Sequence, residues 1–178
     1  ELNLDVQNTG AQPHTNADYF VALGSAAPIH PKDYPYYTRL VWCINGKARD
    51  RNVSSFQGSG GVLGIGAHAA QPVFQENFAG AEWTAVTDQF FATIIAPLNA
   101  KATGIWGRSF DVSTEQNTAG IEGAMRMPGF QVQPGHLADV TDLRGVFSRT
   151  LQQADDFRGF AFDLVLVGLR RGVEAGEH

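Results

Sequence analysis

The sequence predicts a mostly β protein with antiparallel pairing, and three observations support this prediction. Apolar and polar side chains alternate over short segments, as at Leu2, Leu4 and Val6 in residues 1–7. Twenty glycines and eight prolines supply frequent turns, while 43% hydrophobic against 17% charged residues indicates a globular chain. Only residues 137–157 carry a helical pattern, with Asp139 or Thr141 as candidate caps.

The first half of the chain contains four predicted strands. Residues 1–7 end at the turn Asn8-Thr9-Gly10, and residues 19–23 form the next strand. Residues 24–35 hold three prolines, so we expect an irregular excursion there. Residues 36–44 are β-branched and aromatic, and Asn45-Gly46 predicts a two-residue hairpin turn into residues 47–53.

The second half is predicted to contain one long strand and two shorter ones. Residues 83–97 (WTAVTDQFFATIIAP) are expected to form a central strand, bulged where Phe90 and Phe91 break the alternation. Residues 105–112 and 121–127 are the two further strands, separated by the polar turn at residues 113–120. Pro128-Gly129 and Pro134-Gly135 mark turns after them.

Length and charge restrict the class of protein. A chain of 178 residues is expected to be one domain, and its formal net charge of −5 disfavours nucleic-acid binding. The apolar runs at residues 90–98 and 160–169 are much shorter than the roughly 20 residues of a spanning helix. The chain opens directly on a strand without a methionine or signal segment, so we expect a piece excised from a longer protein.

The usual signatures of chemistry are weak. The glycine-rich residues 58–66 lack the Lys-Ser/Thr ending of a phosphate loop, so we interpret them as a plain loop or bulged strand. No Gly-x-Ser-x-Gly elbow is present, and Cys43 lies in an apolar strand where core packing is expected. We predict neither a metal site nor a cofactor, because no spacing places two imidazoles together among His14, His30, His68, His136 and His178.

A few side chains remain binding candidates. Asp88 either faces solvent, which we favour, or accepts backbone hydrogen bonds, or lies in a cleft with a shifted pKa. Aromatic rings stack on sugars and peptides, so Tyr34 and Tyr36 are candidates for a binding groove. Trp42 and Tyr37 are expected to pack in the core. A catalytic pair of carboxylates could be drawn from Asp88, Asp111, Glu115 and Glu122, although we interpret them as residues of turns and strand edges.

Three stretches resemble the large extracytoplasmic domain of YidC-type membrane protein insertases. They are ALGSAAPIHPKDYPYYTRLVWCINGKARDRNVSSF at residues 22–56, EWTAVTDQFFATIIAP at residues 82–97 and GIEGAMRMPGFQVQPG at residues 120–135. The similarity covers about residues 1–135. In the second stretch the family pattern is carried by Trp83, Ala85, Val86, Gln89, Phe90, Phe91 and Ala92, with Pro97 closing the apolar tail.

The resemblance implies a β-sandwich of the supersandwich type, related in shape to galactose-mutarotase-like domains, over residues 1–135. Residues 136–178 are left unassigned, and the helical pattern lies in them. The resemblance also implies that the domain lies on the periplasmic side of the bacterial inner membrane and catalyses no reaction of its own. It implies contact with translocon components and nascent membrane proteins through a parent protein. Membrane attachment would come from helices outside this chain, so no insertase active residue is transferred to it.

Two other functions stay open. A carbohydrate-active protein on a mutarotase-like sandwich would use a histidine and a carboxylate such as His30 and Glu76 as acid and base. A free-standing carbohydrate- or peptide-binding module would depend on exposed aromatic side chains near Tyr34.

Overall fold

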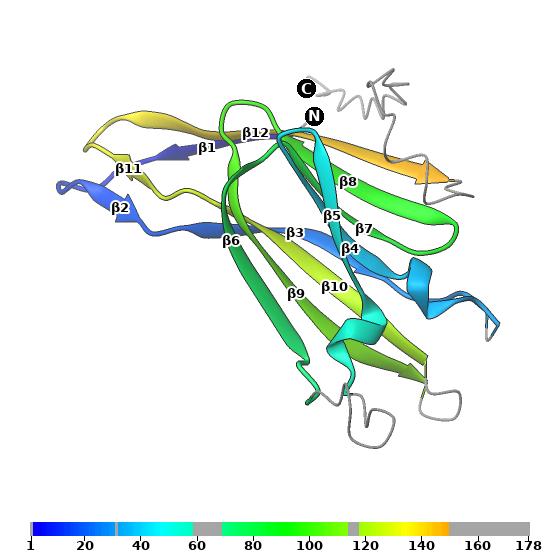
Figure 1. Ribbon diagram of the computed structural model, residues 1–178. Helices are drawn as coiled ribbons and strands as arrows, with labels where there is room; N and C mark the ends of the chain where they lie inside the picture. The colour runs from blue at the N-terminus through cyan, green and yellow to red at the C-terminus, as the bar shows by residue number, and fades with distance from the viewer. Residues whose placement is uncertain (1, 31, 59–68, 114–117, 150–178) are drawn as a thin grey trace, which may run out of the picture.

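The part of the protein that the structure describes contains two large antiparallel β-sheets and a small two-stranded sheet (Figure 1). The computed structural model describes residues 2–30, 32–58, 69–113 and 118–149. The six-stranded sheet has the order β1-β12-β8-β7-β4-β5. Its strands are β1 (Leu2–Gln7), β4 (Arg39–Ile44), β5 (Lys47–Asn52), β7 (Trp83–Thr87), β8 (Phe91–Pro97) and β12 (Leu137–Arg149).

The four-stranded sheet has the order β3-β10-β9-β6. It contains β3 (Tyr19–Ala26), β6 (Val73–Ala81), β9 (Ala102–Ser113) and β10 (Thr118–Met127), whereas β2 (His14–Asn16) pairs with β11 (Phe130–Val132) in the small sheet. Two short 3-10 helices, η1 (Pro35–Tyr37) and η2 (Val53–Phe56), flank the β4–β5 hairpin. The prediction of a mostly β, antiparallel fold is confirmed.

The main core lies between the two large sheets. Leu40 and Trp42 of β4 point into it, and they meet side chains of the four-stranded sheet such as Ile105 and Met125. The intervening Val41 and Cys43 pack on the opposite face of the six-stranded sheet with Trp83 and Ala85. This alternation is the two-residue period of a strand, and it makes the molecule a two-layer sandwich.

The β4–β5 hairpin confirms the predicted turn. Asn45 has φ 52° and Gly46 has φ 70°, so both central residues adopt the left-handed region that a type I′ turn requires. The strand before the turn begins at Arg39, three residues after the predicted start at residue 36. The reason is that Pro35–Tyr37 form the helix η1. The strand β3 also runs three residues beyond the predicted end, to Ala26.

The prediction of one central strand over residues 83–97 is wrong, because the segment is the β7–β8 hairpin. The carboxylate of Asp88 accepts hydrogen bonds from the backbone N–H groups of Phe90 at 2.6 Å and Phe91 at 2.8 Å. The N–H of Asp88 donates to the carbonyl oxygen of Phe91 at 2.9 Å. These local bonds give the backbone a turn in place of a continuing strand.

The predicted helix at residues 137–157 is also wrong where it can be compared, since residues 137–149 form β12. This strand lies between β1 and β8 and pairs antiparallel with both. Two neighbouring strands therefore supply its backbone partners and override a weak helical periodicity. Residues 137–149 thus belong to the same sheet as the sandwich portion. Residues 150–157 lie outside the described part, as does the glycine-rich loop from residue 59 to 66.

In the described residues, no helix is long and apolar enough to cross a membrane.

Candidate binding surface

The two tyrosines singled out from the sequence are exposed at one end of the sandwich. Tyr34 and Tyr36 have relative exposures of 69% and 55%. They flank Pro35, whose fixed φ suits the first position of η1. The N–H of Tyr37 donates to the carbonyl oxygen of Tyr34 at 3.0 Å, which closes the turn. A short turn therefore presents both rings to solvent.

Tyr37 and Arg39 contact these rings. The ring of Tyr37 meets those of Tyr34 and Tyr36 edge to face, with centroid distances of 6.4 and 5.8 Å. The guanidinium carbon of Arg39 lies 4.5 Å from the centroid of Tyr36, a cation–π geometry. The carbonyl oxygen of Tyr37 accepts a hydrogen bond from Thr87 Oγ1 at 3.1 Å. We call Tyr34, Tyr36, Tyr37 and Arg39 the tyrosine surface.

The β7–β8 turn and the loop before η1 lie beside each other at this end. Asp33 Oδ2 accepts hydrogen bonds from the N–H groups of Ile29 at 2.9 Å and His30 at 2.8 Å. The imidazole of His30 then meets the ring of Phe90 edge to face, with centroids 6.0 Å apart. Ile29 is 51% exposed.

Asp88 serves the turn in the structure. Its carboxylate accepts two backbone hydrogen bonds and the residue is half-buried, so the structure shows the second of the three possibilities and not the solvent-facing one that we favoured. It lies next to Thr87, which bonds to Tyr37. The three binding candidates Tyr34, Tyr36 and Asp88 therefore gather at the same end of the sandwich.

The residues that carry the family pattern are packing residues. Trp83 is 7% exposed in the cluster with Val41 and Cys43, while Pro97 ends β8 opposite Leu143. Gln89, Phe90 and Phe91 are half-buried at the β7–β8 turn. None of them projects as a reactive group.

The proposed acid and base lie on separate elements with separate partners. His30 Nδ1 is 3.5 Å from Asp33 Oδ2, whereas Glu76 on β6 forms an ion pair with Arg49 at 3.3 Å. Glu122 pairs with Arg108 at 2.7 Å, Asp111 is exposed, and Glu115 lies outside the described residues. Within the described residues no group of three or more His, Cys, Asp or Glu side chains could hold a metal ion.

Cys43 is buried, as expected, at 5% exposure. Burial raises the pKa of its thiol to about 11, and the neighbouring Glu82 carboxylate contributes to the shift. The thiol donates a long hydrogen bond of 3.5 Å to Glu82 Oε2. At neutral pH the sulfur is protonated and unreactive.

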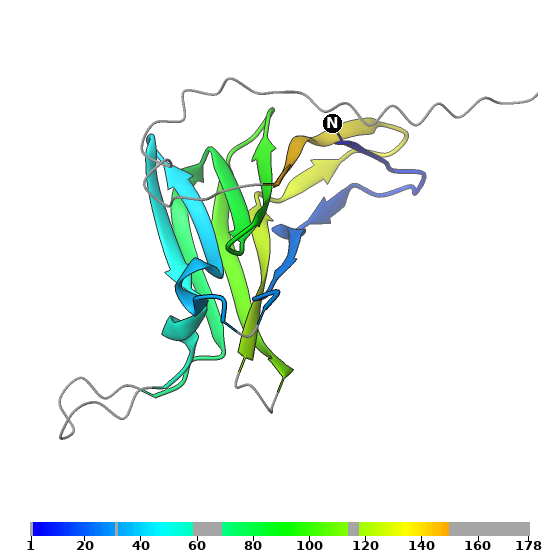
Figure 2. The same cartoon turned by 90° about the vertical axis from the view of Figure 1, so that its right-hand side faces the viewer.

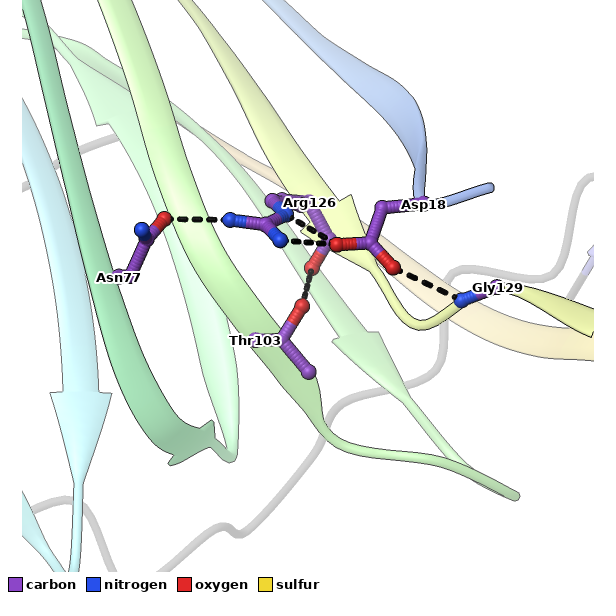
Figure 3. A network of polar contacts seen from close by, with 5 residues as sticks. All are labelled: Asp18, Asn77, Thr103, Arg126 and Gly129. Carbon is purple, nitrogen blue, oxygen red and sulfur yellow. Dashed lines mark hydrogen bonds and ion pairs between the residues drawn. The ribbon is translucent and has the colours of Figure 1, made fainter.

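A polar network that the sequence did not reveal joins β6 and β10 to Asp18 and Gly129, which lie in the segments between strands (Figure 3). Arg126 on β10 binds the Asp18 carboxylate through Nε and Nη2 and donates from Nη1 to Asn77 Oδ1 on β6 at 2.5 Å. The N–H of Gly129 donates to Asp18 Oδ1 at 3.0 Å. The hydrogen bond from Arg126 is the main reason that the pKa of Asp18 is lowered. Because Asp18 and Arg126 are 108 positions apart, no local pattern could have paired them.

No protein-family model matches this chain, and no curated protein matches it either.

Proposed function

We propose that this chain is a partner-binding β-sandwich module from the extracytoplasmic domain of a YidC-type membrane protein insertase. It has no turnover of its own, lies on the periplasmic side of the bacterial inner membrane, and contributes to membrane protein biogenesis. The supersandwich type of fold is part of this proposal. Its sequence support is the resemblance over residues 22–56, 82–97 and 120–135.

The observation that carries the proposal is the tyrosine surface. Tyr34 and Tyr36 are mostly exposed, yet ring contacts and Arg39 hold them in fixed positions. Ordered tyrosines offer a large contact area at low cost in side-chain entropy, which is why interfaces are enriched in them. A binding role explains both the exposure and the order, whereas a core role explains neither.

A photo-crosslinking experiment tests this proposal. A photoreactive amino acid replaces Tyr34, and the protein is mixed with inner-membrane vesicles that carry translocons with stalled nascent membrane proteins. We expect adducts with translocon components or nascent chains. The matched control places the same amino acid at Lys47, which is exposed at the opposite end of the β4–β5 hairpin. Equal labelling from both positions, or none from Tyr34, would contradict the proposal.

Carbohydrate binding is the second candidate, and the same exposed rings favour it because aromatic faces stack on sugars. It predicts saturable quenching of the tyrosine fluorescence by a sugar, lost in Tyr34→Ala. A mutarotase-like activity further predicts that the protein accelerates the optical rotation change of freshly dissolved α-glucose. An unchanged rate would remove the enzymatic version of this candidate.

A further inference from the structure

The two lateral edges of the sandwich differ, because β5 and β6 form one edge and β1 and β3 form the other. On one side, the edge strands β5 and β6 are joined by the Arg49–Glu76 ion pair, and the guanidinium of Arg51 lies 4.7 Å from the ring centroid of Phe74. Four of the six residues of β5 are charged, namely Lys47, Arg49, Asp50 and Arg51. Charged edge strands resist pairing with further strands, so this side is both covered and protected.

The edge strand on the other side of the four-stranded sheet carries no such charges, and its one irregularity is a bulge at Leu23 and Gly24, where the pairing with β10 shifts register. The strand β3 (YFVALGSA) contains no charged residue and no proline. Among the described strands it pairs only with β10, so the opposite backbone edge of residues 20–26 faces outward. An uncharged strand of this length with one unpaired edge is a template for a further strand.

The six-stranded sheet extends beyond this edge. The strand β3 packs against β7 and β8, while β12 and β1 follow β8 outward in the sheet order. Figure 2 shows β1 in dark blue and β12 in orange on the side away from β4 and β5, which are cyan. The four-stranded sheet therefore has no strand opposite β1.

The face of β1 that no other described strand of the two large sheets covers is apolar. Leu2 lies directly opposite Leu143 in the β1–β12 register, and Leu143 is a core residue at 3% exposure. Leu2 and Leu4 therefore share the inward face with Leu143, since alternate residues of a strand point the same way. Their exposures are nevertheless 61% and 42%. We call this face of β1 together with the outward edge of β3 the open side.

We propose that the open side binds an extended segment of another polypeptide by strand addition to β3. Strands in a sheet are about 4.8 Å apart and packed sheets about 10 Å apart, so an added strand would lie above β12 and β1. Its inward side chains would cover Leu2 and Leu4, and its backbone would pair with residues 20–26. The fitting segment is about eight residues long with apolar side chains at alternate positions.

A single segment fits this place better than a second copy of the chain. If two copies paired β3 with β3 around a two-fold axis normal to the sheets, their six-stranded sheets would lie in one layer. The projecting β12 and β1 of each copy would then collide. The chain carries a net charge of −5, so the segment is favoured when its remaining residues are basic rather than acidic.

A peptide titration tests this inference independently of the insertase proposal. The probe is a fluorescein-labelled eight-residue peptide with valine at alternate positions and threonine or lysine between them. We expect saturable binding by anisotropy and slower hydrogen exchange at the amides of residues 20–26. The control peptide is N-methylated on the edge that would pair with β3, and it should not bind.

Protein variants locate the binding. Leu4→Asp should raise the dissociation constant of the peptide by about tenfold or more, because a carboxylate would face the added apolar side chains. The matched control is Val73→Asp, which changes a similarly exposed residue (49%) on the protected edge strand β6 and should bind the peptide normally. Absence of binding at about 1 mM peptide, equal binding of the methylated peptide, or a dimer that Phe20→Lys dissociates would each overturn the inference.

Discussion

Leu40 packs between the two sheets, and its replacement should strongly destabilise the fold. The residue is fully buried at 0% exposure. Gly107 of β9 and Gly123 of β10 lie directly opposite each other in the sheet that it faces. A Cβ atom at Gly107 would lie 2.7 Å from Leu40 Cδ2, and one at Gly123 would lie 2.5 Å from Leu40 Cδ1. The missing side chains of the two glycines thus make the space that Leu40 fills.

The magnitudes follow from this geometry. Leu40→Ala should lower the free energy of unfolding by about 2–5 kcal/mol through lost burial and a residual cavity. Gly123→Ala should cost about 1–3 kcal/mol, because the new methyl would also lie 2.9 Å from Val86 Cγ1 and the core must shift. The smaller entropy of the unfolded chain offsets less than about 1 kcal/mol of that.

The double variant tests whether Leu40 and Gly123 share one packing site or destabilise the protein independently when replaced. In Leu40→Ala/Gly123→Ala, the added methyl occupies part of the space that Leu40 leaves. The combined loss should be smaller than the sum of the single losses by about 1–2 kcal/mol. Urea unfolding followed by tryptophan fluorescence measures all four proteins at equal ionic strength. A strictly additive double variant, or a Gly123→Ala protein as stable as the parent, would refute the reasoning.

Three further outcomes are expected. Cys43 should react slowly with a disulfide reagent at neutral pH and at the normal rate after unfolding, because its pKa is raised to about 11; fast native reaction would contradict the buried thiol. The pKa of Asp18 is lowered from 3.8, so its stabilising effect relative to Asp18→Asn should be complete above that value. This stabilising effect should disappear as the pH falls through the pKa of Asp18 in the folded protein. Denaturant midpoints of the parent and Asp18→Asn that differ by the same amount at all pH values would contradict this. Gly46→Ala should lower the free energy of unfolding by about 1–2 kcal/mol, because Gly46 has φ 70°, whereas Ala48→Gly in the following strand should cost about 1 kcal/mol or less.

Features set by neighbouring residues could be predicted from the sequence. The Asn45-Gly46 turn, the strands at residues 105–112 and 121–127, and the buried Cys43 all follow from turn chemistry or alternation, and the structure confirms them. The sequence does not decide the exposure of Tyr34, because an aromatic side chain at a strand end suits both a core and a surface.

Errors arose where long-range pairing or a side chain decides the backbone. In residues 83–97 the apolar pattern continues through the turn, and only the position of Asp88 relative to Phe91 breaks the strand. In residues 137–149 the helical spacing is real but weak, and two neighbouring strands provide hydrogen bonds that a local pattern does not contain.

The β class and the hairpin turn can be predicted from the sequence alone, because alternation and left-handed turn residues act over a few positions. Which strands are neighbours, and which faces no described strand covers, depends on the three-dimensional packing. The Asp18–Arg126 contact, the Leu40 site between two glycines and the open side beyond β3 all join residues distant in the chain. Their formation depends on how two sheets of unequal width pack, and no short segment contains that information.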